Sequence, residues 1–248
     1  MNVVILCGGK GTRIRGVDDR VPKPMITVGE LPIVVHIMQR YAMYGHRRFV
    51  LCLGYLGNVV ADYFGGSFTD SSSEVDYVLP DGTKIEVVLA NTGEESMTGS
   101  RVAQIQGFVD GDFLLTYGDG VSDVAIDRLV QFHESHDCAM TLTAVRPPSR
   151  FGEVQVDDTG RATSFNEKPQ ASSGLISGGF FVCRTSVFDY LRNDPSLVLE
   201  AEPMREMVKH RALAAYVHPG FWQCMDTYRD WELLNDLERS GKAPWRLS

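Results

Sequence analysis

The chain has 248 residues, 44% of them hydrophobic, and a formal net charge of −8 at pH 7. A chain of this length and hydrophobic content can bury a full core, so we expect a single domain over residues 1–248. The acidic balance argues against a nucleic-acid partner, which would require a basic stripe. No apolar run approaches the ~20 residues that a membrane span needs, so we expect no membrane partner.

The five cysteines are scattered along the chain, and no two of them form a C-x-x-C pair. Residues Met1-Asn2-Val3 lead directly into a predicted strand, so we expect no signal peptide. Both features favour a reducing, cytoplasmic compartment.

A glycine-rich turn follows the first predicted strand, at 3–6. In Cys7-Gly8-Gly9-Lys10-Gly11-Thr12-Arg13 the glycines allow bare backbone N–H groups to approach a phosphate. The spacing fits neither a Walker A loop nor a dinucleotide fingerprint. Glycines alone would fit an ordinary strand-to-helix turn equally well. The positive charges of Arg13 and of Lys23, within Val21-Pro22-Lys23-Pro24-Met25, favour a polyphosphate-binding loop.

Strands and helices alternate along the rest of the chain, and this pattern predicts a doubly wound, mostly parallel, Rossmann-like α/β sheet. Small β-hairpins are expected as additions, and a helical C-terminus at about 227–248. Ligands of such sheets bind beyond the carboxyl ends of the strands, where the glycine-rich turn and Asp119 would lie. The expected strands are 3–6, 49–53, 113–117, 139–145 and 176–182, the hairpins lie at 74–89 and around 157–160, and the helices follow Pro32 and span 58–64 and about 125–136.

The motifs occur in an order that resembles one family. The run L-x-G-G-x-G-T-R with P-K-P-M is similar to the signature of sugar-1-phosphate nucleotidyltransferases, and the series as a whole most resembles the glucose-1-phosphate cytidylyltransferases. The resemblance implies a nucleotide-diphospho-sugar transferase fold. The other matching blocks are Asn91-Thr92-Gly93, 96–101, 117–123, Phe151-Gly152, Asn166-Glu167-Lys168-Pro169, 178–182 and 220–227.

The resemblance implies a Mg²⁺-dependent enzyme that joins a sugar 1-phosphate to CTP and releases pyrophosphate. The acceptor phosphate is itself the nucleophile, so the protein positions the substrates and neutralises charge. Mg²⁺ takes one or two carboxylates and completes its shell with phosphate and water. The family's metal-binding aspartates match Asp119 and Asp226. Taken separately, Asp119 fits a turn residue and Asp226 a helix N-cap. Asp123, a weaker metal candidate, is better explained as a helix cap.

The family motifs also assign roles to residues beyond the metal pair. Arg13, Lys23 and Lys168 are expected to act in catalysis with Asp119 and Asp226. Lys23 would contact the phosphates of the nucleotide, and Lys168 the sugar phosphate. Nucleotide contacts are expected from Leu6, Gly8, Gly9, Gly11, Thr12, Arg13, Lys23, Thr92, Gly93, Thr98, Gly99, Arg101 and Gly118. Acceptor contacts are expected from Tyr117, Glu167, Lys168, Ser177, Gly178, Gly179 and Trp222.

Two features depart from the cytidylyltransferase pattern. Ser177 stands where those enzymes usually carry an asparagine that reaches the sugar hydroxyls, so the identity of the acceptor stays open. The hairpin around Pro80-Asp81-Gly82 is shorter than theirs, which puts their hexamer in question, although a homo-oligomer is expected. Arg101 fits a helix-surface position as well as a contact to the base.

Three other functions remain open from the sequence. The same chemistry could use UTP or dTTP, or the acceptor could be a non-sugar phosphate. The third is a non-catalytic regulatory paralogue, but such a paralogue commonly loses the metal carboxylates or the phosphate-binding lysines. All four of these residues (Lys23, Asp119, Lys168 and Asp226) are present in this chain.

Overall fold

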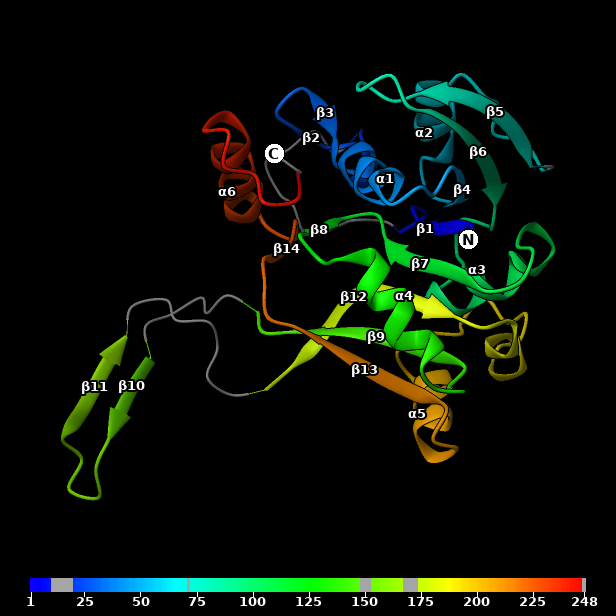
Figure 1. Cartoon of the computed structure of the whole chain (residues 1–248). Helices are drawn as coiled ribbons and strands as arrows, with labels where there is room; N and C mark the ends of the chain where they lie inside the picture. Colours follow the sequence, from blue (N-terminus) through cyan, green and yellow to red (C-terminus); the bar gives the residue numbers. More distant parts are fainter. Residues whose placement is uncertain (10–19, 71, 148–152, 167–173, 247–248) are drawn as a thin grey trace.

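The computed structural model describes residues 1–9, 20–70, 72–147, 153–166 and 174–246 (Figure 1). In this part of the chain a central sheet of eight strands has the order β13-β9-β12-β7-β1-β4-β6-β5. The expected mostly parallel sheet is confirmed, because only β12 and β5 run against their neighbours. The strands are β1 Val3–Leu6, β4 Arg48–Leu53, β5 Ser73–Val78, β6 Lys84–Asn91, β7 Phe113–Tyr117, β9 Met140–Val145, β12 Ile176–Cys183 and β13 Leu213–His218.

The middle of the sheet is buried on both faces, as its continuous apolar runs predict. β1 pairs in parallel with β4 on one side and β7 on the other. Alternate residues of β1 therefore serve different cores: Val3 and Ile5 pack into one, Val4 and Leu6 into the other.

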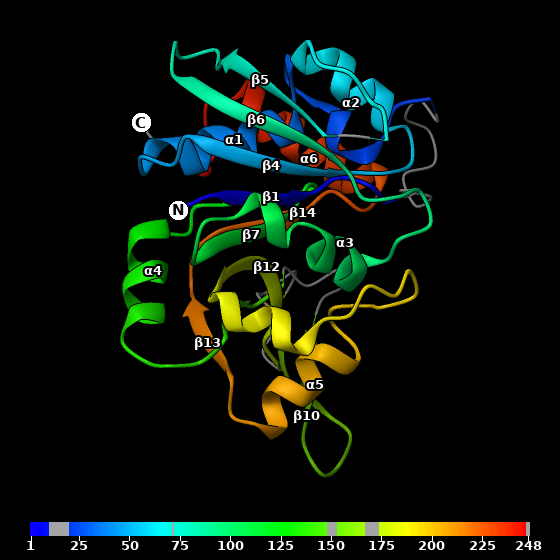
Figure 2. The ribbon, with the colours of Figure 1, turned by 90° about the vertical axis from the view of Figure 1, so that its right-hand side faces the viewer.

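Helices cover both faces of the sheet (Figure 2). The core that contains Val3 and Ile5 is closed by four helices and by Trp245, which is 2% exposed and anchors the C-terminal segment. These helices are α1 Ile33–Met43, α2 Gly57–Phe64, α4 Ile126–Glu134 and α6 Tyr228–Arg239. The opposite core is closed by α3 Thr98–Gln104, α5 Glu202–Lys209 and the 3-10 turn η3 Thr185–Tyr190, and the other 3-10 turns are η1 Lys23–Met25 and η2 Gln106–Phe108. Within the described residues, no helix combines the length and the apolar character needed to cross a membrane.

The C-terminal part of the chain returns to the carboxyl end of β7. There β14 Trp222–Cys224 pairs antiparallel with β8 Gly120–Ser122. The N–H of Met225 then donates to the carbonyl oxygen of Asp119 at 2.8 Å. This pairing brings Asp226 beside Asp119, although the two lie far apart in the sequence. A further short pair, β2 Thr27–Val28 with β3 Leu31–Pro32, precedes α1.

A separate hairpin projects away from the body (Figure 1). Its strands, β10 Glu153–Val156 and β11 Ala162–Asn166, pair antiparallel across the predicted turn. Val154, Val156 and Phe165 are 54%, 62% and 66% exposed. The described residues therefore leave these apolar side chains without a covering layer. A two-stranded hairpin is only marginally stable by itself in water, so burial of these side chains would stabilise it.

Candidate active site

Two cavities meet beyond the carboxyl ends of β1 and β7, where ligands of parallel sheets bind. The first, of about 570 Å³, extends from the glycine-rich turn to the start of α3. The second, of about 280 Å³, lies between β12 and β14. Tyr117, Asp119 and Asp226 line both cavities. A group that passes from a ligand in one cavity to a ligand in the other would therefore pass beside these three side chains.

Most predicted site residues of the described part of the chain lie at these cavities. The first is lined by Leu6, Gly8, Gly9, Lys23, Thr98, Arg101 and Gly118, and the second by Ser177, Gly178, Gly179 and Trp222. Gly11, Thr12, Arg13, Glu167 and Lys168 lie outside the described residues. Lining residues that were not among the predicted site residues are Cys7, Pro24, Glu94, Glu95, Ser96, Met97, Thr116, Gly120, Phe180 and Cys224.

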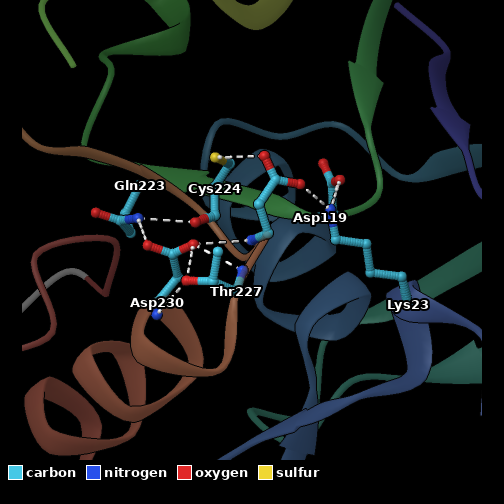
Figure 3. A network of polar contacts seen from close by, with 7 residues as sticks. Lys23, Asp119, Gln223, Cys224, Thr227 and Asp230 are labelled. Atoms are coloured by element: carbon cyan, nitrogen blue, oxygen red, sulfur yellow. Dashed lines mark hydrogen bonds and ion pairs between the residues drawn. The ribbon is translucent and has the colours of Figure 1, made fainter. Parts of the chain in front are cut away.

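Lys23 lies between the two aspartates that match the family's metal ligands, and Figure 3 shows its ammonium beside Asp119. Its Nζ is 2.5 Å from Oδ2 of Asp119 and 2.5 Å from Oδ1 of Asp226. Burial alone would lower the pKa of the Lys23 ammonium, but the charges of the two carboxylates and the hydrogen bonds to them raise it above its usual value. One positive charge therefore already bridges the carboxylates.

Backbone contacts fix where Lys23 and Asp119 lie. Lys23 begins η1 between two prolines, and the N–H of Met25 closes this turn on the carbonyl of Pro22 at 2.8 Å. Asp119 follows Gly118, whose N–H donates to the carbonyl of Leu6 at 3.1 Å. A Cβ at position 118 would lie 3.0 Å from that carbonyl oxygen. The absence of a side chain there lets the end of β7 stay close to β1.

Asp226 is held by the start of α6, and it is not the N-cap of that helix. The N-cap is Thr227, which forms a capping box with Asp230. The carboxylate of Asp230 also accepts from the backbone N–H of Asp226 at 3.1 Å and from the side-chain amide of Gln223 at 3.0 Å (Figure 3). Because another residue caps α6, the carboxylate of Asp226 can face Lys23 and Asp119.

The aspartate pair fits the ion that the family resemblance implies. Within the described residues there is no group of three or more His, Cys, Asp or Glu side chains that could hold a metal. Mg²⁺ does not need such a cage, because it usually binds through one or two carboxylates together with substrate phosphates and water. Asp119 and Asp226 supply two carboxylates at the point where the two cavities meet.

Arg101 is a buried clamp, and its alternative placement on a helix surface is wrong. The residue is 3% exposed. Its guanidinium donates to the backbone carbonyls of Leu53, Gly8 and Gly93 and to the hydroxyl of Thr92, over distances of 2.7–3.0 Å. A Cβ on Gly8 would lie 2.2 Å from this guanidinium, so the glycine is needed for the clamp. Arg101 thus ties the glycine-rich turn to the 92–94 segment.

Thr92, Gly93 and Gly99 do not line either cavity. Thr92 is 1% exposed, and its hydroxyl donates to the carbonyl of Leu53 at 2.8 Å. A Cβ on Gly99 would lie 2.9 Å from Cγ of Leu197. The described structure therefore supplies packing reasons for Thr92 and Gly99, whereas Gly93 is exposed and has a φ of +85°. Direct contact of these three residues with a nucleotide stays a prediction.

The second cavity is built around Tyr117. Its ring lies over Gly179, where a Cβ would be 2.3 Å from Cδ2 of the ring and where φ is +76°. The ring also meets Phe181 edge-on, with centroids 5.7 Å apart. Trp222 closes the other side by donating its indole N–H to the carbonyl of Gly178 at 2.7 Å. Ser177 is exposed at the mouth of this cavity.

Asp123 is not the helix cap that the sequence suggested. The residue before α4 is Ala125, and no side chain caps this helix. The carboxylate of Asp123 instead lies 2.8 Å from Nε2 of His218 on β13. Asp123 therefore links the end of β8 to strand β13 at the edge of the central sheet.

Comparisons with known proteins agree with this geometry. Residues 2–228 match the sequence family described as nucleotidyl transferase. The chain is 41% identical to the glucose-1-phosphate cytidylyltransferases of Salmonella typhi and Salmonella typhimurium, with 99% of both chains covered in each case. The crystal structure of HddC from Yersinia pseudotuberculosis shares the fold, with a TM-score of 0.68 at 18% identity over 95% of this chain and 98% of that one. The chain belongs to the nucleotidyl transferase family.

Proposed function

We propose that this protein joins a sugar 1-phosphate to CTP and releases pyrophosphate. The observation that carries the proposal is the meeting of two cavities at Asp119 and Asp226, with the ammonium of Lys23 between these carboxylates, which would bring a nucleotide and an acceptor phosphate to one charged centre. The Salmonella relatives, named as cytidylyltransferases of glucose 1-phosphate, support both the base and the class of acceptor.

The reaction is a displacement at the α-phosphorus of CTP. An oxygen of the acceptor phosphate forms the new P–O bond, and the bond to the bridging oxygen breaks with its electron pair leaving on pyrophosphate. Neither substrate needs a nucleophile from the protein. The first cavity would hold the triphosphate and the second the acceptor, so that attack would proceed past Asp119 and Asp226.

Asp119 and Asp226 would hold the metal ion in this reaction. Bound Mg²⁺ would neutralise charge on the α-phosphate and the leaving group. In the loaded enzyme Lys23 would turn from the carboxylates to the phosphates, where its ammonium acts as a point charge. Arg13, with the neighbouring Gly11 and Thr12, is proposed on the triphosphate, and Lys168 with Glu167 on the acceptor. These roles rest on the family motifs, since the five residues lie outside the described ones.

One screen distinguishes the proposed function from the alternatives that use another base, use another acceptor or lack catalysis. Pyrophosphate release is measured with four nucleoside triphosphates against sugar 1-phosphates and non-sugar phosphates. The proposal expects CTP with a sugar 1-phosphate to give the highest kcat/KM. A preference for UTP or dTTP would replace the base assignment, and a preference for a non-sugar phosphate would replace the acceptor class. Release with no pair would indicate a non-catalytic paralogue.

We also propose that the chain forms a homo-oligomer in the cytoplasm. The exposed Val154, Val156 and Phe165 on the β10–β11 hairpin support a subunit contact, because burying them would stabilise this hairpin. The five free cysteines are consistent with a reducing compartment. Light scattering coupled to size exclusion tests the assembly: Phe165→Asp should shift the wild-type oligomer toward monomer. A wild-type monomer would contradict it.

A further inference from the structure

Glu200 joins the walls of the two cavities, although the sequence motifs did not single it out. Its carboxylate accepts a hydrogen bond from the hydroxyl of Tyr117 through Oε1. Its other oxygen, Oε2, accepts from the hydroxyl of Thr98 at 2.7 Å. Thr98 lines the first cavity, and Tyr117 lines both. One carboxylate therefore connects a side chain of the nucleotide cavity to the shared wall.

The backbone around Glu200 is fixed against the start of α3. The N–H of Met97 donates to the carbonyl of Pro195 at 2.8 Å, and the N–H of Ser100 to that of Leu197 at 3.1 Å. The N–H of Leu199 donates to the hydroxyl of Thr98 at 2.9 Å. Gly99 permits this close approach, as described above. The carboxylate of Glu200 is thus presented from a segment that is hydrogen-bonded to the edge of the nucleotide cavity.

The packing of Tyr117 leaves its side chain little room to move independently of Glu200. Its ring is held between Gly179 and Phe181, and its hydroxyl ends on the carboxylate. A shift of Thr98 on nucleotide binding would therefore be passed through Glu200 to the ring that forms the wall of the acceptor cavity.

We propose that Glu200 is a positioning residue that couples nucleotide binding to acceptor binding. The inference rests on the proposed function, because it requires the two cavities to hold the two substrates. Coupling of this kind makes the acceptor bind more tightly once the nucleotide is present, and by linkage the nucleotide gains equally from the acceptor.

The test measures binding of glucose 1-phosphate by calorimetry, to the free enzyme and to the enzyme saturated with a CTP analogue carrying an α,β-methylene bridge. In the wild type the analogue should tighten binding by at least about fivefold. Glu200→Ala and Tyr117→Phe should each reduce this ratio to below about twofold, and the double variant should reduce it no further. Glu200→Gln, which keeps one acceptor oxygen, should keep part of it.

Glu202→Ala is the matched control. Glu202 lies two residues away, is exposed, and pairs with Arg192 at 2.8 Å on the surface. This control should keep the wild-type ratio. A wild-type ratio near one, or Glu200 variants that lower the melting temperature and leave the ratio unchanged, would overturn the inference. Pyrophosphate release by the wild type in the same preparation separates this failure from failure of the proposed function, which would abolish that release.

Discussion

Replacing Lys23 with methionine should tighten metal binding to the substrate-free enzyme and weaken its fold. In the wild type, a metal ion that binds Asp119 and Asp226 must first displace the ammonium that lies 2.5 Å from each carboxylate. Methionine has a similar length and no charge, so Lys23→Met removes the competitor and leaves two carboxylates facing each other. The same change should abolish most of the turnover, because the phosphates lose a positive charge.

The magnitude follows from the two contacts. A hydrogen bond between charged groups contributes about 1.5–3 kcal/mol. Because the two carboxylates are 28% and 31% exposed, water screens both pairs, and we take about 2 kcal/mol for the two together. The free energy of unfolding should therefore fall by about 2 kcal/mol without metal. The dissociation constant for a divalent cation should fall about 30-fold, which is the same energy expressed as affinity.

The assay is a titration with Mn²⁺ in the absence of nucleotide, followed by electron paramagnetic resonance and by thermal unfolding. Mn²⁺ should raise the melting temperature of Lys23→Met more than that of the wild type, because a ligand stabilises the state that it binds. Lys84→Met, which changes an exposed lysine at the start of β6, is the control. If Lys23→Met binds Mn²⁺ no more tightly than this control, the metal does not compete with Lys23, and the reasoning is refuted.

Five further substitutions test the site and the fold around it. Asp119→Asn and Asp226→Asn should each lower kcat about 100-fold or more while the far-UV spectrum stays unchanged; retained turnover would exclude them as metal ligands. Arg101→Lys should lower the free energy of unfolding in urea by about 3 kcal/mol, because lysine cannot replace the buried fork of donors; a loss below 1 kcal/mol is not compatible with the clamp. Ser177→Asn should shift preference toward glucose 1-phosphate by about 1 kcal/mol, unless the wild type already prefers that acceptor, which would show Ser177 to be neutral. Burial lowers the pKa of His36 to about 4, whereas its pKa in the unfolded chain is about 6.5. The neutral imidazole therefore stabilises the fold by up to about 3 kcal/mol above pH 6.5, and this contribution is lost as the pH falls toward 4. Over that pH range the free energy of unfolding, measured in urea, should fall less for His36→Gln than for the wild type.

Most of the fold could be predicted from local sequence patterns. The central strands begin and end within one residue of the predicted positions, because β1, β4 and β7 are continuous apolar runs flanked by turn residues. The aspartate pair was also predictable, since each aspartate follows a strand and matches a family motif.

The roles of individual side chains could be predicted less well, because these roles depend on partners that are far away in the sequence. Arg101 contacts Gly8 across 93 positions, and nothing near Gly8 indicates that its missing side chain makes room for a guanidinium. Asp123 finds His218 across 95 positions instead of capping its own helix. Glu200 was missed altogether, because its two partners lie 83 and 102 positions away. Pairings of this kind are set by the order of strands in the sheet and not by local propensity.

Pyrophosphate release from CTP and a sugar 1-phosphate, measured with Mg²⁺ and with excess chelator, tests the central claim most directly. The two cavities that meet at Asp119 and Asp226 predict rapid release that requires the acceptor and stops when the chelator is added, and the similarity to the Salmonella cytidylyltransferases predicts a preference for CTP over UTP and dTTP. Full activity in the presence of the chelator, or no release with any combination of triphosphate and sugar 1-phosphate, would contradict it.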